Sequence, residues 1–124
     1  WGVGRPGDSA ELIREFQMEE LMKTTVSKLS GGMKRRLCIA CALAGWPPIL
    51  LMDEPTTALD LYYKEAIGSF MKQYCAGNGI IVMTTHDERE ILSCDRCLLM
   101  REGDLTELAK EERNMESVRK MLAW

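Results

Sequence analysis

The sequence predicts an α/β fold built on a parallel sheet. Short continuous apolar runs alternate along the chain with longer segments in which apolar residues recur at helical spacing. The runs at residues 49–53, 80–86 and 97–100 are expected to be strands, because a strand covered on both faces carries apolar residues without alternation. Strands that alternate with helices favour a parallel sheet. With 124 residues, 46% of them hydrophobic, the chain has the size and composition of one domain or part of a larger one.

Two helices are expected before the first strand. Residues 1–9 are predicted as coil, and residues 10–22 as a helix, because their apolar side chains fall close to helical spacing. Ser30 is then expected to cap a second helix, which Gly45 ends. The two prolines that follow Gly45 prevent this helix from continuing into the strand.

The second half of the chain continues the alternation. Pro55 ends the first strand, and residues 59–74 are expected to form the next helix. An Asn-Gly turn leads into the second strand, whose β-branched residues suit a sheet. A short helix is expected at residues 87–92, before the third strand. After a turn at "EGD", a charged amphipathic helix is expected at residues 106–122.

Charge and hydropathy exclude several classes of function. The formal net charge of −3 and the isoelectric point near 5.2 argue against a nucleic-acid partner, which normally requires a basic surface. No apolar run approaches the roughly 18 residues that a membrane-spanning helix needs. No basic leader precedes an apolar run, so no secretion signal is recognised.

The five cysteines include two pairs with metal-like spacing, Cys38 with Cys41 and Cys94 with Cys97. A zinc site usually places two such pairs in turns, roughly 15–20 residues apart. Here the pairs are much further apart, and both fall within apolar periodic segments. Free, buried cysteines acting as small hydrophobes are therefore the preferred interpretation. Reduced thiols imply a cytosolic chain.

The glycine-rich segment "GVGRPGDS", residues 2–9, fits two phosphate-binding templates only in part. Asp8 occupies the position that must carry lysine to hold phosphates, and a carboxylate there would repel them. No strand precedes Gly2, and Pro6 lacks the amide that a phosphate cradle would use. This segment is interpreted as an ordinary loop.

The run "ILLMDEP" predicts a phosphoryl-transfer site at the end of the first strand. Asp53 can hold Mg²⁺, usually through the water shell of the ion, and Glu54 can polarise a water for attack on a γ-phosphate. The only histidine, His86, stands at the end of the second strand. Because parallel strands end at one edge of the sheet, these three residues are expected to share that edge. The alternative is that the two acids merely end a strand and cap the next turn.

A second candidate site is the stretch "LSGGMKRR". Ser30 offers a hydroxyl, Gly31 and Gly32 leave their amides open, and the N-terminal end of the following helix attracts anions. The bases at residues 34–36 spread around a helix. They are interpreted as a surface that faces solvent or a membrane partner rather than as phosphate ligands.

Three motifs together resemble the ATP-binding cassette (ABC) family of transport ATPases. "LSGGMKRRLCIACALAG" resembles the signature of the family, "ILLMDEPTTALD" its Walker B motif with the D-loop, and "TTHD" its H-loop. The resemblance runs from about residue 10 to residue 105, in the family order and at compatible spacing. The signature carries Met33 where many members have glutamine, which bears on the subfamily more than on the chemistry.

The resemblance implies the C-terminal part of a P-loop NTPase (RecA-like) parallel sheet. Residues 1–28 would be the tail of the helical subdomain, and residues 29–124 the C-terminal half of the ATPase core. The P-loop, the adenine-stacking aromatic residue and the Q-loop of the family precede the signature, and none is recognised here. The P-loop strand would lie between the second and third strands, so the isolated chain is expected to be inactive and to self-associate.

The resemblance also implies the roles of the site residues, with ATP and Mg²⁺ as cofactors. Two cassettes would dimerise head to tail, so that each signature closes over the nucleotide of its partner. Asp60 would be the D-loop acid that couples the two sites, or a helix N-cap, or both. The implied sites are catalytic Glu54 and His86; nucleotide-binding Ser30, Gly31, Gly32 and Met33, acting in trans; Asp60; and Mg²⁺-binding Asp53.

The function implied is that of an ATP-binding subunit that drives transport of an unknown substrate through transmembrane partners. Such a subunit would lie in the cytoplasm against the inner face of the membrane. Two alternatives remain: a truncated, non-catalytic interaction fragment, and a soluble ABC ATPase without a transport role. A P-loop in the reading frame upstream of Trp1 would favour an ATPase.

Overall fold

The computed structural model describes residues 10, 13–14 and 16–123. These residues form two compact units, of which the first ends at Thr84 and the second begins at Thr85. The loop at residues 2–9, which the sequence excludes as a P-loop, lies outside the described residues. The boundary expected between residues 28 and 29, which separates two subdomains, is a different division. It stays a prediction.

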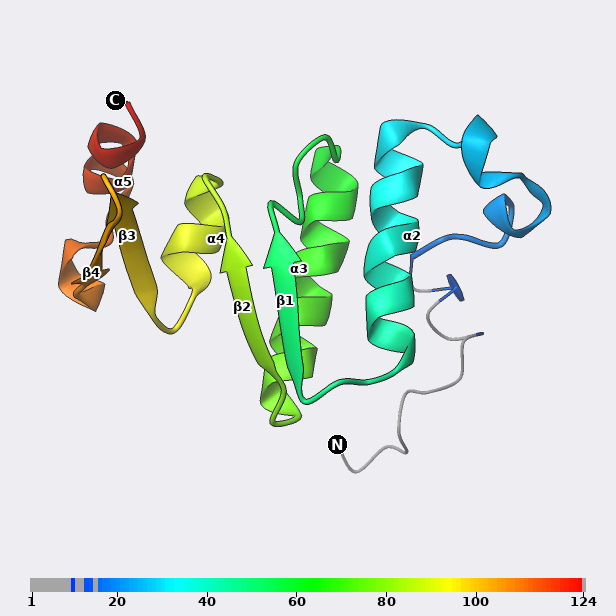
Figure 1. Ribbon diagram of the computed structural model, residues 1–124, viewed down its shortest axis with the longest axis horizontal. Helices are drawn as coiled ribbons and strands as arrows, with labels where there is room; N and C mark the ends of the chain where they lie inside the picture. Colours follow the sequence, from blue (N-terminus) through cyan, green and yellow to red (C-terminus); the bar gives the residue numbers. More distant parts are fainter. Residues whose placement is uncertain (1–9, 11–12, 15, 124) are drawn as a thin grey trace. The chain divides into compact units, whose positions relative to one another are not determined.

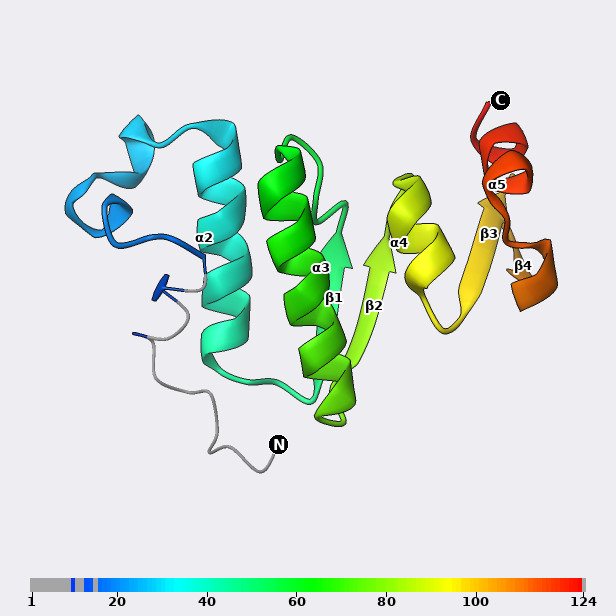
Figure 2. The same ribbon diagram turned by 180° about the vertical axis from the view of Figure 1, so that it is seen from behind.

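The first unit is a two-stranded parallel sheet with helices on one face. Strand β1 (Ile49–Asp53) pairs with β2 (Ile80–Thr84), so that Ile49 lies opposite Ile80 and Asp53 opposite Thr84. Helices α2 (Gly31–Ala44) and α3 (Leu61–Ala76) precede and follow β1. Seen from opposite sides, β1 lies in front of α3 in one view and behind it in the other (Figures 1 and 2). The expected parallel pairing is thus confirmed for the first two strands, with their flanking helices. The strand expected at residues 97–100 does form, but it pairs antiparallel with the segment at residues 104–108 rather than joining this sheet.

The core lies between the sheet and these helices. From the sheet, Leu50 is buried, and Met52, Ile81 and Met83 pack against the core. The helices contribute a cluster of fully or nearly buried side chains. The partly buried ring of Trp46, which follows α2, packs against this cluster with its centre 5.3 Å from that of Tyr74. The main members of the cluster are Ile39, Leu43, Ile67, Phe70, Met71 and Tyr74.

Gly79, just before β2, is required by this core. A Cβ atom at residue 79 would lie 2.2 Å from the Tyr74 ring, far inside van der Waals contact. The amide of Gly79 also donates to the Tyr74 carbonyl at 3.0 Å. The turn can therefore approach the aromatic ring only because the residue has no side chain.

On the opposite face of the sheet, the side chains of both strands are exposed in the part of the chain that the structure describes. Leu51 is 76% exposed, and Ile49, Ile80 and Val82 are each more than half exposed. The expectation that both strands are buried on both faces is therefore wrong for these residues. The physical reason is that α2 and α3 cover only one face, so every second residue of each strand points away from the core.

The segment before α2 does not form the continuous helix expected at residues 10–22. Ala10, Ile13 and Arg14 have helical backbones, but Gln17 has a φ of 49° that ends regular structure there. Two short 3-10 helices follow, η1 (Leu21–Lys23) and η2 (Val26–Lys28). The buried Phe16 and Met18 belong to the core cluster and attach this segment to the helices.

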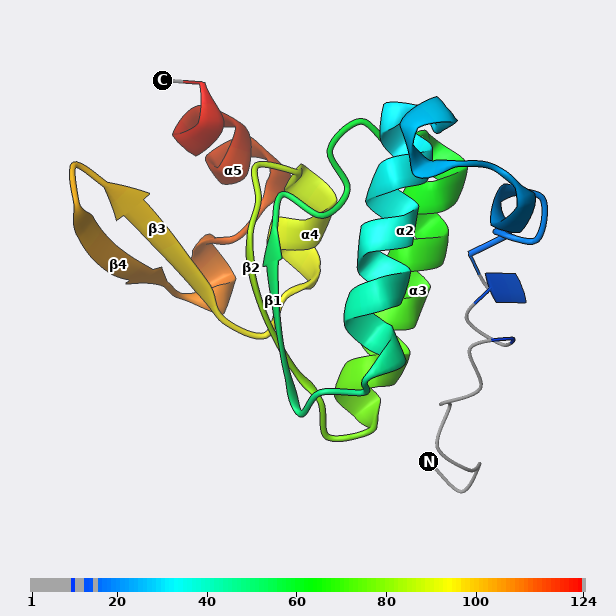
Figure 3. The ribbon, with the colours of Figure 1, turned by 45° about the vertical axis from the view of Figure 1, so that its right-hand side comes forward.

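The second unit contains two α-helices and a hairpin. Helix α4 (Glu88–Ser93) precedes the antiparallel strands β3 (Cys97–Arg101) and β4 (Asp104–Leu108), which are followed by η3 (Lys110–Glu112) and α5 (Met115–Leu122). The hairpin is prominent in Figure 3. Glu88 and Arg119 join α4 to α5 through an ion pair of 2.9 Å.

The helix expected at residues 106–122 is wrong in its first part, which is strand β4 and the short η3. Glu102 and Gly103 have φ values of 51° and 92°, the left-handed conformations of a tight hairpin turn. This turn reverses the chain, and residues 104–108 then pair with β3. No described helix is long and apolar enough to span a membrane.

Candidate functional site

The carboxylate of Asp53 lies at the end of β1, beside the last residue of β2. The Thr84 hydroxyl donates a hydrogen bond to Asp53 Oδ1. Because the parallel register sets these two residues opposite each other, the contact follows from strand pairing. The Asp53 side chain is exposed. The Thr84 hydroxyl contacts only Oδ1 of the carboxylate, so Oδ2 remains available to a water or a cation.

Glu54 is held in an unusual backbone conformation directly after the strand. Its φ of 49° lies in the left-handed region, which costs a non-glycine residue roughly 1–2 kcal/mol. Its amide donates to the Thr84 carbonyl at 3.0 Å and to the Thr84 hydroxyl at 3.3 Å. Its carboxylate accepts from the Thr57 hydroxyl at 3.0 Å. The half-buried Glu54 carboxylate is thereby oriented by Thr57, and the Asp53 carboxylate by Thr84.

Ser30, Gly31 and Gly32 form the beginning of α2, as the sequence predicts. The Ser30 hydroxyl oxygen accepts from the Met33 amide at 3.2 Å, and the first intrahelical bond runs from Lys34 to the Ser30 carbonyl. The amides of Gly31 and Gly32 precede that bond, so they are the donors that a helix N-terminus presents to an anion.

The two glycines differ in their surroundings. A Cβ atom on Gly31 would meet nothing within 4 Å. One on Gly32 would lie 3.4 Å from the Ala58 carbonyl oxygen and 3.6 Å from Leu59. Packing within this chain therefore does not explain a glycine at residue 31, whereas Gly32 lies against the loop that follows Glu54.

That loop ends at Asp60, whose side chain accepts from the Tyr63 amide at 3.1 Å and caps α3. The N-cap interpretation of Asp60 is thus confirmed. Its interpretation as a D-loop acid concerns a partner cassette and stays a prediction.

The bases after the glycines do not form one surface. Lys34 is exposed, whereas the Arg35 guanidinium donates to the Asp53 carbonyl oxygen at 3.3 Å. Arg36 is only 6% exposed, donates to the Phe16 carbonyl at 3.1 Å and lies 3.8 Å from the centre of the Tyr63 ring. The expectation that all three bases face solvent or a partner is therefore wrong. The helix turns two of them toward neighbouring elements.

His86 follows β2 by two residues and is exposed. It belongs to the second compact unit. Its meeting with Asp53 and Glu54 at one edge stays a prediction. The next residue, Asp87, caps α4 by accepting from the Arg89 amide at 2.9 Å.

The described residues suit a magnesium ion held mainly by water and phosphate. No group of three His, Cys, Asp or Glu side chains among them could hold a metal ion alone. Mg²⁺ commonly keeps several waters and takes only one or two protein carboxylates beside the phosphates of a substrate. An exposed Asp53 with one oxygen fixed by Thr84 fits that donor set.

The cysteines are not the buried hydrophobes that the sequence predicts. Cys38, Cys41 and Cys75 are exposed, and Cys94 and Cys97 are half-buried. Cys38 and Cys41 lie on the solvent side of α2. The spacing of apolar residues alone does not show which of two adjacent helical positions faces the core.

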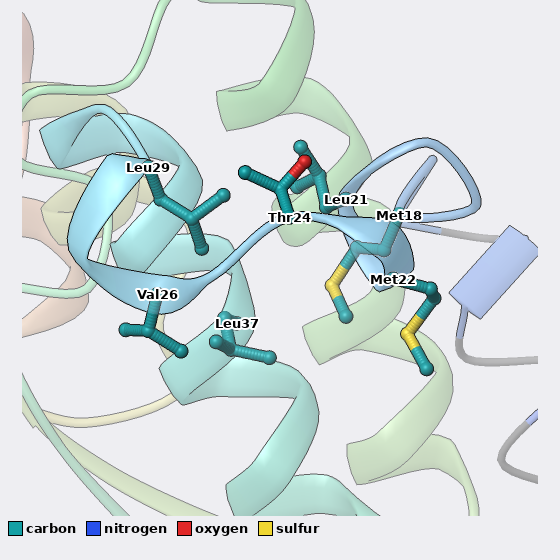
Figure 4. Close-up of a pocket in the computed structure, with 7 residues that line it drawn as sticks. All are labelled: Met18, Leu21, Met22, Thr24, Val26, Leu29 and Leu37. Atoms are coloured by element: carbon teal, nitrogen blue, oxygen red, sulfur yellow. The ribbon is translucent and has the colours of Figure 1, made fainter.

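A cavity of about 180 Å³ lies between the η1–η2 segment and α2 (Figure 4). Its lining consists of apolar side chains and one threonine, so it offers no charged group to a phosphate. This cavity is therefore not the nucleotide site. It is lined by Met18, Leu21, Met22, Thr24, Val26, Leu29 and Leu37.

Sequence reasoning missed three residues that position the site: Thr84, Thr57 and Arg35. Thr84 could have been found from the strand register, and Thr57 from its place three residues after Glu54, a common spacing for a side-chain turn. The contact of Arg35 with the end of β1 could not be predicted from nearby residues, because Arg35 and Asp53 lie 18 residues apart and meet only when the helix packs beside the strand.

Comparison with known proteins places these features in a family. A family model described as ABC transporter matches residues 6–57. The spermidine/putrescine import ATP-binding protein PotA of Pseudomonas fluorescens is 36% identical over 111 residues, covering 88% of this chain and 30% of that protein. The Nod factor export ATP-binding protein I of Rhizobium etli is 40% identical over 96 residues, covering 76% of this chain and 30% of that protein. The chain thus spans about 30% of the length of these curated relatives.

A solved dimer of an ATP-binding cassette in a post-hydrolysis state, bound to ADP and Pi, has a similar structure. The TM-score is 0.74 at 32% sequence identity, covering 82% of this chain and 45% of that one. The expected fold, part of a P-loop NTPase of the cassette type, is confirmed by this similarity.

Proposed function

Because the chain belongs to the ABC transporter family, we propose that it is the C-terminal part of an ATP-binding subunit. This subunit couples ATP binding and hydrolysis to transport through transmembrane partners. The observation that carries the proposal is the acidic end of β1, where Thr84 and Thr57 orient two adjacent carboxylates separately. Adjacent but separately held acids suit the two tasks of phosphoryl transfer, which are metal binding and water activation.

Glu54 is the proposed base that orients and polarises the attacking water. A general base must be positioned before its basicity matters, and the bond from Thr57 and the left-handed backbone supply that positioning. Asp53 is the residue that would hold Mg²⁺ through its water shell; the bound ion would offset charge on the phosphates. His86 is proposed to donate a hydrogen bond to the γ-phosphate.

Ser30, Gly31, Gly32 and Met33 are proposed to bind the nucleotide held by a second cassette, and Asp60 to couple the two sites. The open space at Gly31 supports this proposal, because a glycine that packing does not need is suited to close approach by a ligand. The ordered N-terminus of α2 supplies amide donors and the positive end of the helix dipole.

Residues 1–28 are proposed as the tail of the helical subdomain, and residues 29–124 as the C-terminal half of the ATPase core. The complete protein would act in the cytoplasm, against the inner face of a membrane. One relative carries the name of a polyamine importer and another that of a Nod factor exporter. Neither a substrate nor a direction of transport is therefore assigned, and the isolated chain is proposed to be inactive.

The open face of the β1–β2 sheet favours a second candidate, a non-catalytic interaction fragment. Leu51 and Val82 are 76% and 56% exposed, and such apolar surface normally marks a contact. The reading frame upstream of Trp1 separates the two candidates. A G-x-x-x-x-G-K-[ST] segment after a strand supports the ATPase, and its absence supports the fragment.

The test of the ATPase is Glu54→Gln in the complete cassette that contains this sequence. ATP hydrolysis, measured as phosphate release, should fall by roughly 10²–10⁴-fold, the usual contribution of a general base, while ATP binding by calorimetry stays unchanged. His86→Ala should also reduce hydrolysis. The exposed Glu19, changed to glutamine, is the matched control. Normal turnover in Glu54→Gln, equal to that of the control, would refute the catalytic assignment.

A further inference from the structure

The hydroxyl of Thr84 contacts both acidic residues at the end of β1. It donates to Asp53 Oδ1 and accepts from the Glu54 amide at 3.3 Å. The same amide also donates to the Thr84 carbonyl at 3.0 Å, so it is shared between two acceptors of one residue. A single threonine at the end of β2 therefore holds the carboxylate of one acid and the backbone of the other.

The direction of the hydroxyl proton follows from the chemistry of its two neighbours. An ionised carboxylate can only accept a hydrogen bond, and a backbone amide can only donate one. The proton of the Thr84 hydroxyl therefore points at Asp53, and a lone pair of its oxygen faces the Glu54 amide. Because both sides of the hydroxyl are engaged, it cannot turn toward solvent without losing one of these bonds.

Strand pairing sets the position of this hydroxyl but does not require it. The parallel register places Thr84 opposite Asp53 at the end of the β1–β2 pair. The Thr84 side chain is exposed, and valine, which has the same shape without the hydroxyl, suits a strand as well as threonine does. Packing of the sheet therefore does not explain why residue 84 carries a hydroxyl.

Thr57 provides a comparison, because its side chain contacts only one of the two acids. Its hydroxyl donates to Glu54 Oε2 at 3.0 Å, and among the described residues it makes no bond to Asp53. Like Thr84, it is exposed. Both threonines thus hold Glu54, one through the carboxylate and the other through the amide, but only Thr84 also holds the carboxylate proposed to bind Mg²⁺.

A hydrogen bond to a metal-binding carboxylate affects how well the metal is held. With Oδ1 fixed by Thr84, the Asp53 carboxylate presents Oδ2 in one direction. Mg²⁺ demands near-ideal octahedral geometry, so the direction of a carboxylate oxygen matters to the ion and to its waters. Loss of such a supporting group typically costs roughly 10–100-fold in metal affinity or activity.

We propose that Thr84 is a positioning residue that couples the two tasks of the acidic pair. Its hydroxyl orients the Asp53 carboxylate toward the metal, and the same oxygen, with the Thr84 carbonyl, fixes the backbone from which Glu54 reaches the attacking water. This inference rests on the proposed ATPase function. It goes beyond that function by making metal binding and water activation depend on one side chain for which the sequence predicts no role.

The first experiment measures metal binding without turnover, in the complete cassette that contains this sequence and carries Glu54→Gln. Thermal unfolding is followed with ATP at increasing Mg²⁺, and the readout is the Mg²⁺ concentration that gives half of the maximal stabilisation. Thr84→Val should raise this concentration by about tenfold, because Asp53 loses its hydrogen bond. Thr57→Val should leave it within about twofold of the starting value, because Thr57 does not contact Asp53.

The second experiment measures turnover with Glu54 intact. Thr84→Val and Thr57→Val should each lower kcat by about tenfold at saturating Mg²⁺, because each removes a bond that positions Glu54. Thr84→Ser keeps the hydroxyl and should restore both kcat and the Mg²⁺ requirement. Thr106→Val, at an exposed threonine of β4, is the matched control and should change neither quantity.

A merely structural role for Thr84 would lower the unfolding temperature without nucleotide and leave the Mg²⁺ requirement unchanged. That result would overturn the inference while the proposed function stands. The same holds for a Thr84→Ser variant that behaves like Thr84→Val, or for an equal rise in the Mg²⁺ requirement of Thr57→Val. If ATP and Mg²⁺ together do not stabilise the original cassette, or if Glu54→Gln hydrolyses ATP normally, the proposed function fails and the inference fails with it.

Discussion

Arg36 shows how one buried charge joins separate parts of the first unit. Its Nη1 donates to the Phe16 carbonyl at 3.1 Å, and its guanidinium lies over the Tyr63 ring. Its Nε atom is buried without a hydrogen-bond partner in the structure. A buried cation is tolerated only where nearby dipoles and π systems replace water. Arg36 thus connects α2, α3 and the segment before η1.

Arg36→Ala should lower the free energy of unfolding by about 2–4 kcal/mol. A buried hydrogen bond from a charged donor contributes about 1.5–3 kcal/mol, and the contact with the aromatic ring about 0.5–2 kcal/mol. Urea denaturation followed by circular dichroism measures the change. Lys34→Ala, two residues earlier and exposed, should change it by no more than about 0.5 kcal/mol. Similar effects for both variants would contradict the structural role of Arg36.

At the scale of elements, the helices begin where short polar side chains precede them. Ser30 caps α2, Asp60 caps α3 and Asp87 caps α4, each by accepting from an amide two or three residues ahead. In α2 this cap has a functional consequence. It occupies the Met33 amide and leaves those of Gly31 and Gly32 outside the helical hydrogen bonds, as the proposed contact with a nucleotide requires.

Ser30→Ala should destabilise the chain by about 1 kcal/mol, because the Met33 amide loses its capping acceptor. Ser30→Asn should keep the cap and stay within about 0.5 kcal/mol of the original, since asparagine is as good an N-cap as serine. Thermal and urea unfolding of the two variants provide the measurement. If Ser30→Asn is as unstable as Ser30→Ala, the hydroxyl contributes through some contact other than the cap.

At the scale of the whole molecule, the most consequential feature is that the parallel sheet has two strands and one covered face among the described residues. The open face carries Ile49, Leu51, Ile80 and Val82, all more than half exposed. Strand edges with free amides and carbonyls also invite pairing with another chain. A second copy of this chain offers the same apolar face and can cover it.

The isolated chain is accordingly expected to form a dimer or a larger species at micromolar concentration. Light scattering after size exclusion gives the mass directly. Replacing Leu51 and Val82 together by lysine should shift the chain toward the monomer, because charges on this face cannot be buried without partners. Lysine substitution of the exposed Glu19 and Glu20, away from the sheet, is the control. A cooperative, well-folded monomer of the original chain would contradict the expectation.

The sequence by itself determined the features that depend on neighbours within a few residues. The caps at Ser30 and Asp60 and the end of α2 at Gly45 are local contacts, so residue type and order were enough to predict them. The acidic pair at the end of β1 and the glycines at the start of α2 were placed in the same way, while their chemistry stays a proposal. Strand β3 and the turn after it were predicted, but β4 was missed, because the mixed apolar and charged residues from 104 onward also suit an amphipathic helix.

Only the tertiary structure decided which side chains meet across the fold. Thr84 reaches Asp53 because the strands pair in one register, and Arg36 is buried because α2 turns it toward Tyr63. Neither contact has a local signature, since its partners lie 31 and 27 residues apart in the chain. The exposure of side chains was also decided by the tertiary structure. The sequence predicts Cys38 and Leu51 to be buried, yet both are exposed. Periodicity assigns residues to a face of an element, and only packing decides which face is covered.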